Sequence, residues 1–103
     1  MPKVVLTREA VADVAEATAW YRGRSLRAAE EFLLAVNMAL ARIETQPTAQ
    51  VIVDAGTGAR RALLRKFPHR VLYVIDEGKL VVFAVMHHRR DEPVWRERLE
   101  RKP

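Results

Sequence analysis

Basic side chains that could bind phosphate gather in the second half of the chain. An array of guanidinium and ammonium groups binds phosphate oxygens and can stabilise the pentacoordinate transition state of RNA cleavage. A histidine within such an array could move a proton. For any single arginine, a solvated strand end without a ligand remains the alternative. The residues concerned are Arg60, Arg61, Arg65, Lys66 and Arg70, followed later by His87, His88, Arg89 and Arg90.

Other kinds of catalytic site lack their characteristic residues. The four glycines form neither a GxGxxG pattern nor a Walker-type phosphate loop. The absence of cysteine excludes disulfides, thiolate metal sites and a thiol nucleophile. Ser25 is the only serine and is a predicted helix cap, and the spacing of His69, His87 and His88 does not suit zinc. We therefore expect no metal and no cofactor.

Three aromatic residues have more than one interpretation. Trp20 and Tyr21 could form a stacking platform for bases, but we favour packing where a helix meets the sheet. Trp95 lies in a polar and basic segment, which we treat as a basic C-terminal tail over residues 88–103. Its ring could fold back onto the edge of the sheet or contact a partner.

Two helices are predicted in the first half of the chain. Apolar residues recur at helical spacing from Arg8 to about Arg22, with Thr7 as the cap at the start. Gly23 is predicted to end this helix in the left-handed conformation. Ser25 begins a second, longer amphipathic helix that Pro47 ends. Two such helices with a short turn between them indicate an αα-hairpin.

Short strands are predicted before and after these helices. The first covers residues 4–6, and four more cover about residues 51–53, 60–66, 70–76 and 79–87. Glu77 and Gly78 make a tight hairpin connection, since glycine readily adopts positive φ. We predict a single α+β domain over residues 1–103, in which an N-terminal strand and a helical hairpin pack on an antiparallel sheet.

Composition and charge indicate the kind of partner. The chain has 103 residues and a net charge of +5, and twelve of its eighteen basic residues lie in 58–103. Such asymmetry favours an anionic partner, either nucleic acid or an acidic protein, although a solubilising surface is the alternative. No signal peptide is visible, and the longest apolar run is far below the roughly 20 residues of a membrane span. We expect a soluble cytoplasmic protein with no membrane contact.

The order of motifs resembles the RelE/ParE superfamily of toxins, within it the ParE-like, or plasmid stabilisation, branch. Neither of the two strand motifs suffices alone, but their order and spacing agree with the family over nearly the whole chain. The matching residues are Leu6, Thr7, Ala10, Ala12, Asp13, Ala17, Trp20, Tyr21, Ala28 to Leu40, Ile43, Pro47, Arg60, Arg61, residues 67–73 (FPHRVLY), residues 82–90 (VFAVMHHRR), Pro93 and Trp95.

This resemblance implies a twisted antiparallel sheet and the toxin half of a type II toxin–antitoxin system. It also implies a cognate antitoxin, ParD-like or similar, whose disordered acidic or amphipathic segment would fold over the basic surface and part of the helical hairpin. ParE-like members inhibit DNA gyrase and so block replication, generally without the catalytic residues of the RelE-like ribonucleases. We therefore expect gyrase inhibition by binding alone.

A RelE-like, ribosome-dependent mRNA endonuclease is the alternative implied by the same resemblance. It would use Arg65, Arg70 and either His87 or His88 to bind phosphate and transfer protons. The chain has no tyrosine after Tyr73 and few lysines, which counts against it. For contact with a target or partner we predict Arg60, Arg61, Arg65, Arg70, His88, Arg89, Arg90 and Trp95.

Overall fold

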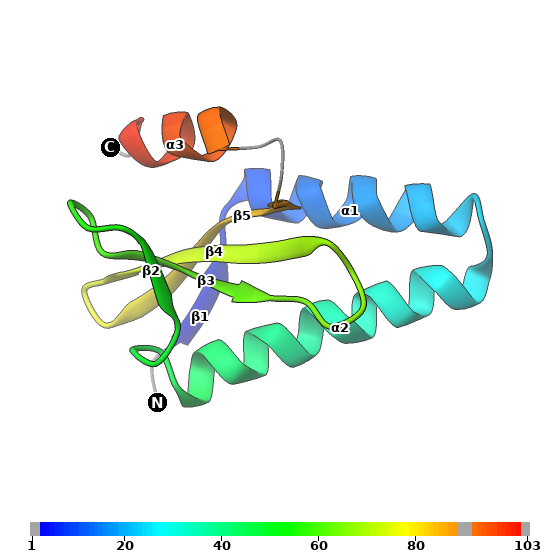
Figure 1. Ribbon diagram of the computed structural model, residues 1–103, viewed down its shortest axis with the longest axis horizontal. Coiled ribbons are helices and arrows are strands. Elements are labelled where there is room, and N and C mark those ends of the chain that lie inside the picture. Colours follow the sequence, from blue (N-terminus) through cyan, green and yellow to red (C-terminus); the bar gives the residue numbers. More distant parts are fainter. Residues whose placement is uncertain (1–2, 89–91, 102–103) are drawn as a thin grey trace.

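The computed structural model describes residues 3–88 and 92–101 and places three helices on a five-stranded sheet (Figure 1). A strand begins this part of the chain, two long helices follow, then four strands and a short third helix. In chain order the elements are β1 (Lys3–Leu6), α1 (Arg8–Arg22), α2 (Leu26–Thr45), β2 (Val51–Asp54), β3 (Ala59–Leu63), β4 (His69–Asp76), β5 (Lys79–His87) and α3 (Glu92–Glu100).

The predicted caps and the predicted tight turn are confirmed. The Thr7 hydroxyl accepts a hydrogen bond from the Ala10 N–H at 3.1 Å, and the Ser25 hydroxyl accepts one from the Ala28 N–H at 3.0 Å. Each bond satisfies one of the amide groups that a helix leaves unpaired in its first turn. In the β4–β5 turn, Glu77 and Gly78 both have positive φ, 51° and 78°, as a type I′ hairpin requires.

Gly23 does not have the predicted left-handed conformation. Its φ is −62°, so the chain stays right-handed and the turn is closed by hydrogen bonds from the Arg24 and Ser25 N–H groups to the Tyr21 carbonyl. The change of direction comes at Ser25, which is extended with φ of −168°. Glycine suits this tight turn for space, since a Cβ at position 23 would lie 3.3 Å from the Trp20 carbonyl oxygen.

The sheet has the order β1-β5-β4-β3-β2 and is mixed rather than wholly antiparallel as predicted. β2 to β5 pair antiparallel with their neighbours, but β1 runs parallel to β5, from Lys3 opposite Lys79 to Leu6 opposite Val82. The two helices that follow β1 explain the difference. A parallel pair needs a long crossover, and the helical hairpin is part of the connection between these strands.

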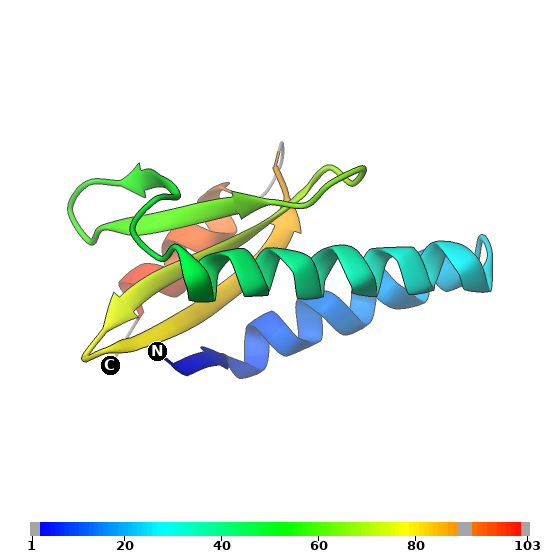
Figure 2. The ribbon, with the colours of Figure 1, turned by 90° about the horizontal axis from the view of Figure 1, so that it is seen from below.

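The helices form layers on both faces of the sheet. Figure 2 shows α1 and α2 along one face, with α3 on the other, and the hairpin extends past the end of the sheet. Two cores result from this arrangement. The first lies under the hairpin around Phe32, Ile43 and Tyr73, and the second lies under α3 around Trp95, Leu72 and Phe83.

The predicted basic tail contains a helix. α3 covers Glu92–Glu100 and buries Trp95 and Leu99, while its other residues are mostly charged. Two apolar positions four residues apart give a weak sequence signal, and contact with the sheet supplies what the periodicity lacks. Among the described helices, none is long and apolar enough to cross a membrane.

Candidate functional sites on the two faces of the sheet

The register between β4 and β5 separates the predicted phosphate-binding residues. His69 pairs with His87 and Arg70 pairs with Met86, and neighbouring residues of a strand point to opposite faces. Arg70 and Met86 therefore lie on the α3 face, whereas His69 and His87 lie on the hairpin face. An acid–base set that needs Arg70 beside His87 is not assembled in this structure.

A bulge in β5 decides which histidine lies on which face. Leu72 pairs with Ala84 and Tyr73 with Val82, so Phe83 is an extra residue in the ladder. The alternation of the strand shifts by one position there. Val82 and then Val85 both pack in the core under the hairpin, and His87 follows Val85 onto that face.

The three histidines gather where β4 and β5 end. The His87 ring stacks on His88 with centroids 5.2 Å apart and meets the His69 ring at 5.9 Å. His88 is exposed and is held by its backbone N–H, which donates to the Pro68 carbonyl at 2.9 Å. His69 also packs against Phe32, with ring centroids 5.0 Å apart. In the described part of the chain, no three side chains are grouped as a metal site would require.

The predicted pair Arg60 and Arg61 divides in the same way. Arg60 donates hydrogen bonds to the carbonyls of Thr48 and Gln50, at 3.0 and 2.7 Å, and so holds the loop before β2. Arg61 pairs with Leu72 in the ladder and therefore lies on the α3 face, where it is half-buried. Arg60 has a structural role, which the sequence pattern did not indicate.

On the α3 face, Arg70 lies beside Trp95 and is half-buried. The Arg70 guanidinium carbon is 5.8 Å from the centre of the Trp95 ring, and that of Arg96 is 4.9 Å from it. Trp95 is only 2% exposed, so the alternative in which it folds back on the protein holds in this structure. Its contact with a partner stays a prediction, and it would require α3 to leave the sheet, because the ring is covered in this structure.

An ion pair that sequence reasoning missed joins α1 to α3. Arg98 donates two hydrogen bonds to the Asp13 carboxylate, at 2.7 and 3.0 Å, and both side chains are largely buried. Asp13 also accepts from the Val85 N–H at 3.0 Å, and Arg98 donates to the Phe83 carbonyl at 3.1 Å. The pair therefore supplies hydrogen-bond partners to backbone groups on the edge of β5, beyond the point where its pairing with β1 ends. Because 85 positions separate the partners, no local pattern could have revealed them.

Further ion pairs attach α3 and the residue that follows it, and they perturb two titrating groups. Asp54 lies 3.0 Å from Arg96, and Glu9 lies 2.7 Å from Arg101. Hydrogen bonds from Thr57 and Arg96 lower the pKa of Asp54, and the hydrogen bond from Arg101 lowers the pKa of Glu9. Both carboxylates are thereby stabilised in their charged form.

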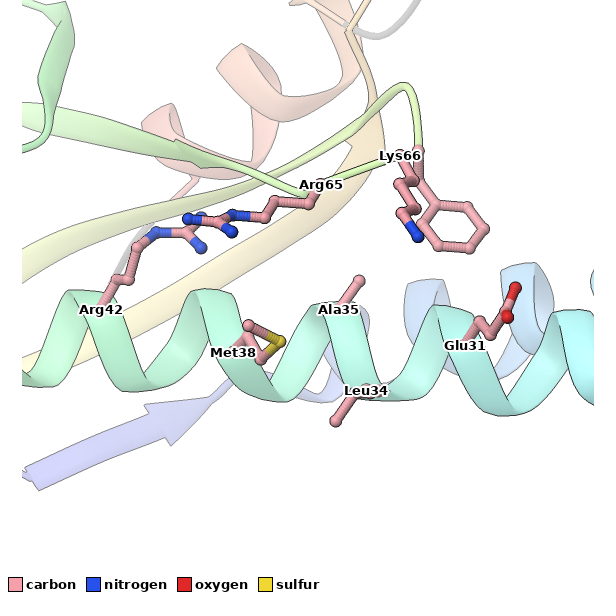
Figure 3. A pocket seen from close by; sticks show the side chains of 8 residues that line it. Glu31, Leu34, Ala35, Met38, Arg42, Arg65 and Lys66 are labelled. Carbon is pink, nitrogen blue, oxygen red and sulfur yellow. The ribbon is translucent and has the colours of Figure 1, made fainter.

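A cleft of about 300 Å³ lies between α2 and the loop that joins β3 to β4 (Figure 3). The figure shows the side chains of Arg42 and Arg65 extended toward one another over the helix, with Lys66 farther along the cleft. Arg42 donates to the Leu63 carbonyl, and Arg65 is exposed. Of the basic residues in the predicted phosphate-binding array, Arg65 and Lys66 line this cleft.

A second groove, of about 490 Å³, follows the outer side of the hairpin between α1 and α2. Its walls are mostly apolar and include Val11, Val14, Val36 and Leu40. Val11 is 54% exposed, a high fraction for an aliphatic side chain on an amphipathic helix. Such a groove can take the apolar face of a partner helix. The predicted residues Arg89 and Arg90 lie outside the described part of the chain.

Comparisons with known proteins agree with this architecture. Residues 4–92 match the family described as "ParE toxin of type II toxin-antitoxin system, parDE". Among solved structures, the chain is similar to one titled "Chromosomal ParDE TA system from P. aeruginosa", with a TM-score of 0.69 and 15% sequence identity. That similarity covers 84% of this chain and 96% of the other. No curated protein sequence matches this chain.

Proposed function

Because this chain belongs to the ParE toxin family of type II toxin–antitoxin systems, we propose that it inhibits DNA gyrase and is neutralised by a cognate antitoxin. In this proposal the toxin acts by binding in the cytoplasm and stabilises the cleaved-DNA state of gyrase. The family match over residues 4–92 is the observation that carries it. The geometry of the predicted catalytic residues supports binding over chemistry.

A ribonuclease would need its phosphate-binding and proton-transferring groups around one substrate phosphate. Here Arg70 lies on the α3 face beside Trp95, while His87 lies on the hairpin face. Arg65 lies in the loop before β4, on the rim of another cleft. With His87 as the proton-transferring group, the three groups that the ribonuclease alternative requires therefore lie on three different surfaces. His88, the other candidate, lies just after β5, where its ring stacks on that of His87.

We place the main contact of the antitoxin in the outer groove between α1 and α2. The groove presents exposed aliphatic side chains, and burying such surface contributes about 25 cal/mol per Å². An amphipathic segment that folds on binding would supply the complementary apolar face. The net charge of +5 favours an acidic segment.

A gyrase supercoiling assay with purified toxin, scored for trapped cleaved DNA, tests the target. We expect linear DNA to accumulate and to disappear when the antitoxin encoded beside the toxin gene is added. If toxin that still arrests growth leaves gyrase unaffected, the gyrase proposal fails. Toxin-dependent cuts in mRNA on ribosomes would then establish the ribonuclease alternative.

Arg70→Ala separates the two mechanisms with a matched variant. In a binding toxin, Arg70→Ala and Arg61→Ala should change growth inhibition by similar small factors, because both arginines lie on the α3 face. In a ribonuclease, Arg70→Ala alone should lower cleavage by two orders of magnitude or more, as loss of a transition-state contact does. Primer extension on ribosome-bound mRNA would report that loss.

A further inference from the structure

The cleft between α2 and the β3–β4 loop concentrates positive charge. Arg42, Arg65 and Lys66 all line it, and in the view of Figure 3 the Arg42 and Arg65 side chains extend toward one another. Within the described residues, no carboxylate forms an ion pair with any of the three. Glu31, the acidic residue that lines the cleft, is paired with Arg27 at 3.3 Å. Cations that line one cleft repel each other, and a bound anion would reduce that repulsion.

The loop that carries Arg65 and Lys66 is held in place by aromatic packing. Phe67 meets Tyr21 and Phe32 edge to face, with ring centroids 5.0 and 5.3 Å apart. The Leu64 N–H donates to the His69 carbonyl at 3.0 Å and closes the turn. A ligand would therefore pay little entropy to order this loop, which favours binding by a preformed site.

The floor of the cleft is apolar. Leu34 and Met38 follow one another at a spacing of four on α2 and are 60% and 45% exposed. Ala35 and Phe67 complete this lining between them and the loop. A nucleic-acid backbone would bind the cations but leave these apolar side chains in water. A peptide with aliphatic and acidic side chains would satisfy both.

We propose that this cleft binds an acidic segment of the antitoxin, which seats an aliphatic side chain against Met38 and places carboxylates on Arg42 and Arg65. The choice of partner rests on the proposed function, whereas the chemistry of the segment comes from the cleft itself. The cleft and the outer hairpin groove lie on different sides of α2, with Met38 lining one and Leu33 the other. An antitoxin bound in both would contact α2 on two sides.

The test compares the affinity of the antitoxin encoded by the neighbouring gene for four full-length toxins by calorimetry. These are the wild type, Arg65→Glu, Met38→Ser and the control Arg8→Glu. Arg65 and Arg8 are both exposed, so the two reversals change the net charge equally, and only Arg65 lines the cleft. We expect Arg65→Glu to weaken binding by tenfold or more and Met38→Ser by about fivefold, with Arg8→Glu within about twofold of wild type.

Three results would overturn the proposal. The first is an equal effect of Arg65→Glu and Arg8→Glu, which would leave only a general charge effect. The second is a loss of growth arrest in Arg65→Glu with unchanged antitoxin affinity, which would assign the cleft to the target. The third is tight, Arg65-dependent binding of a single-stranded oligonucleotide that competes with antitoxin, which would make the cleft a nucleic-acid site. An antitoxin that fails to bind even wild type would instead reject the partner in the proposed function.

Discussion

The two faces of the sheet are closed by different kinds of interaction. Under the helical hairpin, the core is a continuous set of aliphatic and aromatic side chains centred on Phe32 and Tyr73. Under α3, the core around Trp95 and Phe83 is smaller. This layer is also attached by ion pairs, which join Arg96, Arg98 and Arg101 to Asp54, Asp13 and Glu9 respectively. Apolar burial is insensitive to pH, whereas carboxylate pairs depend on it. We infer that the hairpin face carries the stability of the fold and that α3 is the more separable layer.

Removing the central ring of the hairpin face should have the largest effect. Phe32 is completely buried and packs against Tyr21 and Phe67, so Phe32→Ala leaves a cavity and is expected to lower the free energy of unfolding by about 3–5 kcal/mol. Urea denaturation followed by circular dichroism measures this. The control is Leu26→Ala on the same helix, which is 62% exposed and should cost less than about 0.5 kcal/mol. An equal loss of stability in the two variants would contradict the inference that the core under the hairpin carries the stability of the fold.

Breaking the Asp13–Arg98 pair should lower the free energy of unfolding somewhat less than Phe32→Ala does. It should destabilise α3 more than the other helices. Asp13→Ala leaves the Arg98 guanidinium and the Val85 N–H without the carboxylate that both contact, which is expected to cost about 3 kcal/mol. Hydrogen exchange should then speed up in α3 more than in α2. Arg27→Ala is the matched control, because it breaks an exposed pair with Glu31 that is worth at most about 0.5 kcal/mol. Uniform acceleration over the whole chain would mean that α3 is not a separable layer.

Acid should release α3 before it unfolds the hairpin. Folding lowers the pKa of Asp54 and of Glu9, so their contribution is complete above the ordinary carboxyl values of about 4 and is lost as pH falls through the lower folded values. The chain has two tryptophans, and Trp20→Phe leaves Trp95 as the only one. Its emission should shift to the red as pH falls below about 4, while the helical circular dichroism changes less. If the fluorescence and circular dichroism transitions coincided, α3 and the helical hairpin would unfold together, and the prediction would fail.

Local sequence signals accounted for much of the hairpin face. Thr7 and Ser25 were found as caps because a helix start needs a side-chain acceptor within three residues. The turn at Glu77 and Gly78 follows equally local rules. The cleft was only partly anticipated, through Arg65 and Lys66. Arg42 was missed because it lies on α2, far along the chain from the β3–β4 loop that completes the cleft.

What the sequence by itself determined are the features set within a few residues of each position. These are the helical periods, the caps, the hairpin turn and the excess of basic residues in the second half. The tertiary structure alone decided where those basic residues point. The bulge at Phe83 turns His87 away from the face of Arg70, and Asp13 meets Arg98 across 85 positions. Register and long-range pairing depend on how the layers pack together, and no short segment of the chain carries that information.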